Sequence, residues 1–242
     1  MTTDGQVVIT SDEILALKKL PKTLAVVGAG VVGIEYACMF ARLGIAVTLV
    51  DKREVPLDFV DREIVDELMH QMRNEKVTFR MGEAVQSVEI VAGQTRRAAI
   101  LLESGKRIVS DMVLYSAGRI GNTDKLNIGV TGLEQDDRGR IKVNENYQTS
   151  VPHIYAAGDV IGYPSLAATS AEQGRRAACH AFGVHAGPME PHFPIGIYAI
   201  PEISVVGANE QELTKQRCPT RSASPATARS RAGRSLGMTR GS

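Results

Sequence analysis

The sequence predicts an α/β protein in three layers, with a parallel β-sheet, helices packed on it and an antiparallel β-meander. Two observations carry this prediction. Between residues 24 and 82, apolar strand patterns alternate with helical patterns, which is typical of a parallel sheet with right-handed crossovers. From residue 84 to 118 the apolar residues instead recur at every second position. The stretches VAGQT and ESGK supply turns there, so this part is expected to form the meander.

Residues 1–23 are expected to lead into this unit. Ser11 or Asp12 could cap a helix whose apolar residues follow at helical spacing, and Pro21 would end it. Residues 23–30 are then expected to form a buried strand that ends in glycines. Residues 31–43 are expected to be helical, and Gly44 ends that helix.

Two more strands, with a helix between them, complete the predicted parallel sheet and its helical layer. Residues 45–51 are apolar and β-branched, which indicates a strand, and residues 77–82 indicate a shorter one. Between them, residues 62–75 form an amphipathic helix with Ile64, Leu68 and Met72 on one face.

The second half of the chain carries fewer elements. Residues 153–162 are expected to form a buried strand running into a glycine turn, and residues 165–183 a helix rich in small residues. The stretch 194–207 is strand-like but interrupted by Pro201, and residues 209–216 indicate a short helix.

Composition and charge exclude several classes of function. The 27 acidic residues all precede Thr220, whereas five of the 28 basic residues follow it, so residues 1–219 carry a net charge of −4. This argues against a nucleic-acid-binding protein. The chain has no apolar run near the roughly 18 residues of a membrane span, so a cytoplasmic protein without membrane contact is expected. The three cysteines and five histidines are scattered, which predicts no metal site.

A glycine motif follows the first buried strand of the predicted sheet. Gly28, Gly30 and Gly33 form GxGxxG at the start of a helix, whose terminal amides suit a pyrophosphate. Asp51 ends the next strand, where a carboxylate can accept hydrogen bonds from ribose hydroxyls. The sequence therefore predicts a Rossmann-like fold that binds a dinucleotide.

The choice between NAD and NADP stays open. Lys52 and Arg53 could pair with a 2′-phosphate, which Asp51 would repel. Alternatively, both are solvated loop charges. If the protein uses both NAD and NADP, the carboxylate of Asp51 and the positive charges of Lys52 and Arg53 both have a role in binding.

A second candidate site follows residues 153–157. Asp159 lies beyond the predicted strand, after Gly158, and a helix with small residues comes next. This arrangement could hold part of a second nucleotide, or Asp159 could simply cap the helix.

Three segments resemble the two-dinucleotide-fold flavoprotein family that includes dihydrolipoamide dehydrogenase and glutathione reductase. They are GAGVVGIEYA, YSAGRIGNTDKL and IYAAGDVIGYPSLA. The first is similar to the family's NAD(P)H motif and the second, which contains Gly118, to its hinge strand. The details, including Gly121 where disulfide reductases usually carry proline, are most similar to the transhydrogenase branch. The resemblance implies an enzyme that transfers hydride between NADPH and NAD through FAD.

The resemblance also assigns roles to single residues. Asp159 would hydrogen-bond the ribityl chain of FAD, and the amides near Leu166 and Ala167 would face the flavin ring. Glu35 would lie in the nicotinamide pocket, near a lysine of another segment; by pattern alone it is an exposed helix glutamate.

The resemblance further implies a domain organisation. Residues 1–23 would be a lead-in from a missing FAD segment, 24–118 the NAD(P)-binding domain and 119–190 the second FAD segment. Residues 191–219 would begin a dimerisation domain. Residues 220–242 are rich in Arg, Ser and Ala and are expected to be a disordered tail, read out of frame rather than native.

A chain truncated at both ends is expected to bind NAD(P) weakly and FAD poorly, and to be inactive alone. Full-length members are expected to be homodimers, and whether this chain dimerises is open. Two alternatives remain for its function. One is a disulfide reductase like dihydrolipoamide dehydrogenase, and the other is a non-catalytic NAD(P)-binding fragment.

Overall fold

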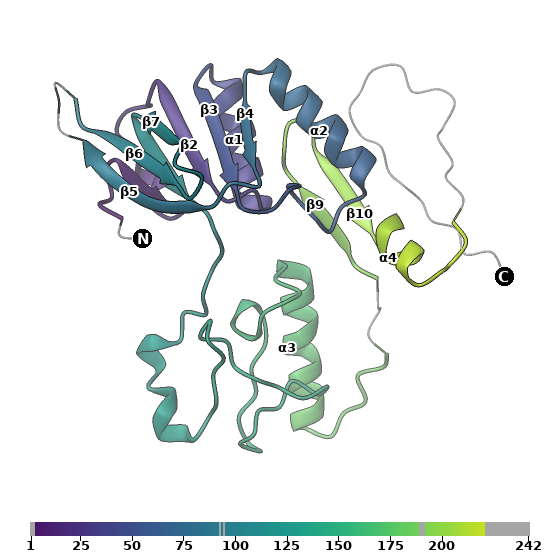
Figure 1. Ribbon diagram of the computed structural model, residues 1–242. Helices are drawn as coiled ribbons and strands as arrows, with labels where there is room; N and C mark the ends of the chain where they lie inside the picture. The colour runs from purple at the N-terminus through teal and green to yellow at the C-terminus, as the bar shows by residue number, and fades with distance from the viewer. Residues whose placement is uncertain (1–2, 92, 94, 189–191, 221–242) are drawn as a thin grey trace. The chain divides into compact units, whose positions relative to one another are not determined.

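The computed structural model describes residues 3–91, 93, 95–188 and 192–220. The chain divides into two compact units (Figure 1). Met1–Gly118 and the segment that begins at Gly196 form the first unit, and Arg119–Ile195 form the second. The predicted tail from residue 221 onward lies outside the described residues. The domain assignments made from the sequence remain predictions.

A five-stranded parallel sheet, in the order β1-β8-β2-β3-β4, organises the first unit. The sequence of β2, α1, β3, α2 and β4 along the chain follows the predicted alternation. The bounds are β1 Val8–Thr10, β2 Thr23–Val27, α1 Val31–Arg42, β3 Ala46–Asp51, α2 Arg62–Asn74, β4 Thr78–Met81 and β8 Met112–Tyr115.

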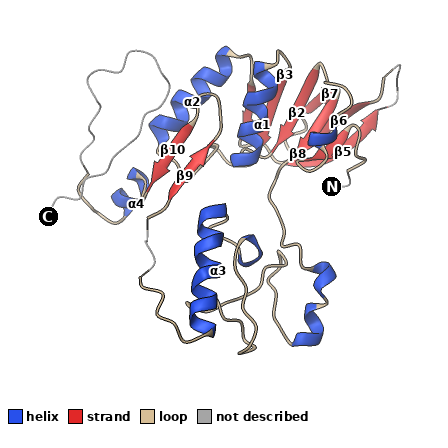
Figure 2. Cartoon of the chain, turned by 180° about the vertical axis from the view of Figure 1, so that it is seen from behind, coloured by secondary structure: helices blue, strands red, loops and turns tan. Residues whose placement is uncertain are grey.

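Helices α1 and α2 lie to one side of this sheet (Figure 2). Leu24 and Val26 of β2 are almost fully buried. The predicted apolar face of α2 is confirmed for Leu68 and Met72, which are buried, whereas Ile64 is only partly buried. Burial of these faces, more than helix propensity, fixes the helices on the sheet.

An antiparallel sheet of three strands packs against the parallel sheet. Its strands are β5 Val85–Val91, β6 Arg97–Leu102 and β7 Arg107–Ser110. Residues of both sheets share one buried cluster, made of Val7, Val8, Ala25, Val27, Val50, Ala98, Ile100, Leu102 and Val113. The predicted three-layer α/β fold is therefore confirmed.

The meander is shorter than predicted, because β8 belongs to the other sheet. It pairs in parallel with β1 on one side and β2 on the other. Met112, Val113 and Leu114 are all buried. A continuous apolar run, rather than an alternating one, is typical of a parallel strand covered on both faces.

The predicted N-terminal helix is also wrong. The structure has only a 3-10 turn, Ile14–Ala16, whose N-cap is Glu13 rather than Ser11 or Asp12. Leu15 is 82% exposed, so the apparent apolar face has nothing to pack against in the described structure. The buried residues lie earlier, in β1, a strand that the sequence pattern did not predict.

The last described elements return to the first unit. Strands β9 Pro194–Ile197 and β10 Ile203–Val206 pair, and helix α4 Glu210–Lys215 follows, as predicted. The Asn209 side chain caps α4 by accepting the Glu212 N–H at 2.7 Å and donates to the Phe59 carbonyl at 3.1 Å. The Asp61 carboxylate accepts the Glu210 N–H at 2.6 Å, which ties α4 to the start of α2.

The second unit has one long helix, α3 Ala167–Ala181, as predicted. The predicted strand at residues 153–162 is wrong. This segment forms one isolated bridge, Gln148 to Tyr155, and a 3-10 turn at Asp159–Ile161. It is apolar enough for a strand, but the described part of the unit offers it no sheet to join. The unit's buried cluster is correspondingly small, with Ile128, Ile141 and Ala156 at its centre.

Candidate functional site

The glycine turn joins β2 to α1 by a very close approach of the two backbones. Gly28 has φ +110°, and a Cβ there would lie 2.6 Å from the Ser116 carbonyl oxygen of the neighbouring chain segment. A Cβ on Gly33 would lie 1.8 Å from the Gly28 carbonyl oxygen. Neither position can accept a side chain, so these two glycines let the helix start directly against the end of the strand.

Gly30 differs from its two neighbours because the space around it is open. A Cβ there would have one neighbour within 4 Å, the Arg53 Nη2 at 3.9 Å. Gly30 is the N-cap of α1 and offers no capping side chain. The intrahelical ladder begins with the Ile34 N–H bound to the Gly30 carbonyl at 3.0 Å. The amides before it therefore form the positive end of the helix, and the turn fits a pyrophosphate.

Asp51 lies at the end of β3, as predicted, and is buried, with 9% of its surface exposed. Its Oδ2 accepts the Ala29 N–H at 2.6 Å, so the carboxylate braces the glycine turn. Burial alone would raise the pKa of Asp51, but hydrogen bonds from the Arg53 side chain and from the Ala29 and Arg53 amides lower the pKa below its ordinary value. The group is therefore a firmly ionised acceptor.

Arg53 forms a two-sided ion pair in the loop after β3. Its Nε and Nη2 donate to Asp51 at 3.1 and 2.8 Å, and its Nη1 donates to Asp58 at 3.1 Å. The hydrogen bond to Asp51 and the charges of both carboxylates raise the pKa of Arg53. Lys52, its neighbour, is exposed. Lys52 and Arg53, which the sequence pattern did not distinguish, therefore have different surroundings in the structure.

Glu35 lies on α1 and is partly exposed. Its Oε1 accepts the Tyr198 N–H at 2.8 Å, so it anchors the segment that follows β9. The Tyr198 ring is 78% exposed. This contact joins residues 163 positions apart, and nothing in the sequence pattern indicated it.

In the second unit, the predicted residues lie around the start of α3. Gly158 has φ +83°, and its N–H donates to the Oε1 of Gln173 at 2.7 Å. Asp159 is exposed at the start of the following 3-10 turn. Leu166 is the N-cap of α3 without a side-chain cap, so amides of Ala167 and the next residues are available at the helix end. An exposed carboxylate and an uncapped helix start fit a polar ligand.

Gly118 and Gly121 border the two units and differ in their surroundings. Gly118 has φ +118° and open space around it. A Cβ on Gly121 would lie 2.2 Å from the Gly139 carbonyl oxygen, and the Gly121 N–H donates to the Arg138 carbonyl at 2.7 Å. Proline has no N–H, so this hydrogen bond explains why glycine rather than proline suits the position.

Sequence reasoning missed three residues that shape the sites. Ser116 donates its hydroxyl to the carbonyls of Val27 and Gly28 at 3.1 and 3.2 Å and closes the glycine turn from the segment after β8. Asp58 holds Arg53. Gln173, 1% exposed, holds Gly158. Ser116 could have been found from the sequence, because it directly follows an apolar strand. Gln173 could not, because a polar residue inside a helical pattern is usually exposed.

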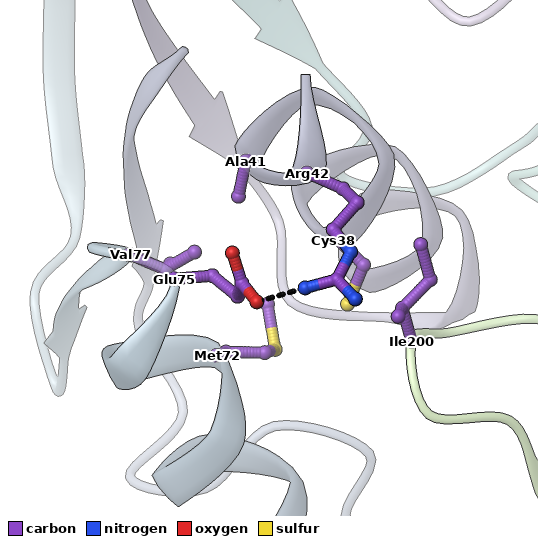
Figure 3. Close-up of a pocket in the computed structure, with 7 residues that line it drawn as sticks. All are labelled: Cys38, Ala41, Arg42, Met72, Glu75, Val77 and Ile200. Carbon is purple, nitrogen blue, oxygen red and sulfur yellow. Dashed lines mark hydrogen bonds and ion pairs between the residues drawn. The ribbon is translucent and has the colours of Figure 1, made fainter. Parts of the chain in front are cut away.

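A small pocket lies between α1, α2 and the segment around Ile200 (Figure 3). It is lined by Cys38, Ala41, Arg42, Met72, Glu75, Val77 and Ile200. Arg42 and Glu75 form an ion pair across it. Burial raises the pKa of the Cys38 thiol, which favours its protonated form. The pocket contains none of the predicted site residues.

Two absences hold for the part of the chain that the structure describes. It contains no group of three or more His, Cys, Asp or Glu side chains placed to bind a metal ion. Across the same residues, every helix is too short or too polar to cross a membrane.

Comparison with known proteins identifies the family. Residues 1–174 match the family described as pyridine nucleotide-disulphide oxidoreductase. The chain belongs to this family. Its members are oxidoreductases that use FAD and NAD(P), which agrees with the cofactors expected from the sequence.

Curated relatives agree with the predicted branch. The chain is 54% identical over 216 residues to a soluble pyridine nucleotide transhydrogenase of Mycobacterium bovis, covering 89% of this chain and 46% of the relative. It is 48% identical to the protein of that name from Vibrio atlanticus, covering 88% of the chain and 45% of the relative. The chain therefore spans slightly less than half the length of these relatives.

Solved structures of the family share the fold. LpdA from Mycobacterium tuberculosis matches with a TM-score of 0.83 and 26% identity, covering 92% of this chain and 48% of the other. The HOCl-induced flavoprotein disulfide reductase RclA from Escherichia coli matches with a TM-score of 0.80 and 26% identity, covering 88% and 48%.

Proposed function

We propose that the chain is the NAD(P)-binding unit and part of the FAD-binding unit of an oxidoreductase that transfers hydride between NADPH and NAD through FAD. The observation that carries the proposal is the glycine turn. Side chains are excluded at Gly28 and Gly33, whereas Gly30, at the positive end of α1, is open. The names of the curated relatives support the reaction itself.

The residues of the first unit would divide the work of holding the nicotinamide dinucleotide. The amides after Gly30 would bind the pyrophosphate, and Asp51, Lys52 and Arg53 would contact the adenosine ribose and its 2′ substituent. Glu35 would help to shape the nicotinamide end. It sits on the same helix and is already held in place by Tyr198.

The second unit would hold part of FAD. Asp159 would accept hydrogen bonds from the flavin's side chain, and the uncapped amides around Leu166 and Ala167 would face the ring. Gly158, with φ +83°, provides the backbone conformation that leads into Asp159. FAD and the nicotinamide dinucleotide would supply the hydride chemistry, and the residues named above would position them.

Disulfide reduction is the second candidate, because solved relatives carry that activity in their titles. The three cysteines of this chain, Cys38, Cys179 and Cys218, are all free, so they contribute no disulfide to such a reaction. We also propose a cytoplasmic setting without nucleic acid, and a homodimer as the assembly of the family.

Titration of the purified chain tests the proposal. Fluorescence of NADH and NADPH should change on binding, and flavin absorbance that the protein retains after incubation with FAD measures how much FAD this part of the site holds. Hydride transfer from NADPH to a thio-NAD analogue then tests the reaction. Turnover supports the transhydrogenase, whereas nucleotide binding without flavin or turnover indicates a non-catalytic NAD(P)-binding fragment. Failure to bind either nucleotide would contradict the proposal.

A further inference from the structure

The carboxylate of Asp51 has no spare acceptor position. An ionised carboxylate has about four lone-pair positions. Here Oδ2 accepts the Ala29 N–H and the Arg53 Nη2, and Oδ1 accepts the Arg53 N–H and the Arg53 Nε. The group proposed to hold the ribose hydroxyls of NAD is therefore already saturated.

Two of these four contacts come from side-chain atoms that can move. The other two come from the backbone amides of Ala29, in the glycine turn, and of Arg53, two residues after Asp51. A ribose hydroxyl can bind Asp51 only if the Arg53 guanidinium withdraws, because the amides are fixed by the fold. Withdrawal leaves a partly buried cation that needs another anion, since its side chain is only 35% exposed.

Asp58 supplies that anion. It already accepts the Arg53 Nη1 at 3.1 Å, and its side chain is 62% exposed, so it has room for further contacts. Its place is fixed by Leu57, which is fully buried and donates its N–H to the Ala29 carbonyl at 3.2 Å. Asp58 is thus held beside the turn that carries the proposed phosphate site.

We propose that Asp58 is a positioning residue that sets the selectivity between NAD and NADP, an inference that rests on the proposed function. When NAD binds, Asp58 retains the Arg53 guanidinium and leaves Asp51 to the ribose hydroxyls. When NADP binds, the 2′-phosphate takes the guanidinium, and Asp58 competes with it for Arg53. One carboxylate therefore favours NAD and disfavours NADP.

The test compares two adenosine nucleotides that differ only in the 2′-phosphate. The purified chain is titrated calorimetrically with 5′-AMP and with 2′,5′-ADP, before and after Asp58→Asn. The substitution should weaken 5′-AMP by about two- to fivefold and tighten 2′,5′-ADP by a similar factor, as expected for loss of one exposed ion pair. Unchanged thermal midpoints show that the variants remain folded.

Glu54→Gln is the matched control. Glu54 lies in the same loop and carries the same charge, but it makes no ion pair with Arg53 in the described structure. Its substitution should shift both nucleotides in the same direction. In an Arg53→Gln background, Asp58→Asn should no longer move the two affinities apart, because the cation that it positions is gone.

Each contrary result has a distinct meaning. Binding of both nucleotides with a selectivity that Asp58→Asn changes no more than Glu54→Gln does would overturn the inference alone. Persistence of the effect in the Arg53→Gln background would also overturn it. If the unsubstituted chain bound neither nucleotide, the proposed function would fail, and the inference with it.

Discussion

The three glycines of the turn between β2 and α1 are required for different reasons. Gly28 and Gly33 are fixed by the close approach of backbone to backbone, which holds whether or not a ligand is present. Gly30 has no such constraint, and its φ of −80° is open to any residue. The fold therefore requires glycine at positions 28 and 33. It does not require glycine at position 30, where ligand binding is the remaining reason for it.

Gly33→Ala should destabilise the first unit by about 3 kcal/mol, at the upper end of the cost of overpacking, because the new methyl would meet the Gly28 carbonyl at 1.8 Å. Urea denaturation followed by circular dichroism measures the change. A variant as stable as the original protein would show that helix and strand are not packed as closely as the structure indicates.

Gly30→Ala should leave stability within about 1 kcal/mol of the unsubstituted chain, since the methyl finds no close neighbour. It should weaken NADH binding by about tenfold or more, equivalent to about 1.4 kcal/mol, because it occupies the space through which pyrophosphate reaches the amides. Fluorescence titration checks the affinity. Equal affinities for NADH would contradict the assignment of this turn.

Asp51 should make stability depend on pH in the acid range. Its folded pKa lies below its ordinary value of 3.8, so its contribution is complete above that value and is lost as the pH falls through the folded pKa. Asp51→Asn should be about 2 kcal/mol less stable at pH 7, the usual size for a charged hydrogen bond, and the difference should shrink below pH 3.8.

Urea unfolding at pH 7, 5 and 3 measures this dependence. Glu103→Gln provides a control, because that carboxylate is exposed in the turn after β6. A gap between the Asp51→Asn variant and the unsubstituted chain that stays constant from pH 7 to pH 3 would count against the predicted titration.

Among the elements, β8 decides how the first unit is built. It comes last of the five strands along the chain but lies between β1 and β2 in the sheet. Its return to the interior of the sheet, beside β2, places Ser116 against the glycine turn and so completes the candidate site. The strand that the sequence pattern assigns to the end of the meander is therefore an interior strand of the parallel sheet.

Leu114→Ala should destabilise the chain by about 2–5 kcal/mol, because Leu114 is fully buried in this central strand. Val109→Ala in β7 provides the comparison and should cost much less, since Val109 is 40% exposed. Thermal and urea unfolding of both variants distinguish the two strands. Similar losses would place β8 at the edge of the fold, contrary to the structure.

At the scale of the whole molecule, the two units have unequal cores. The first contains two packed sheets, whereas the buried cluster of the second is centred on three residues, Ile128, Ile141 and Ala156. Burial of apolar surface is the main source of stability, so the second unit should open more readily than the first.

Hydrogen exchange with mass spectrometry should show this difference in the purified chain. Amides of residues 119–188 should exchange faster than those of the parallel sheet. NAD should slow exchange around residues 28–34 and 51–58 without slowing it in the second unit, because the proposed dinucleotide contacts all lie in the first unit. Protection of both units by NAD would require a different site.

The sequence by itself determined the α/β fold, the glycine turn, Asp51 at the end of β3, and helices α1 to α4. These features follow from local spacing, because strand and helix periods and turn glycines act within a few residues. Tertiary structure decided where β1 and β8 pair, why residues 153–162 are not a strand, and which partners Glu35 and Arg53 have. Strand pairing and ion pairs depend on which segments meet in space, and no local pattern specifies that.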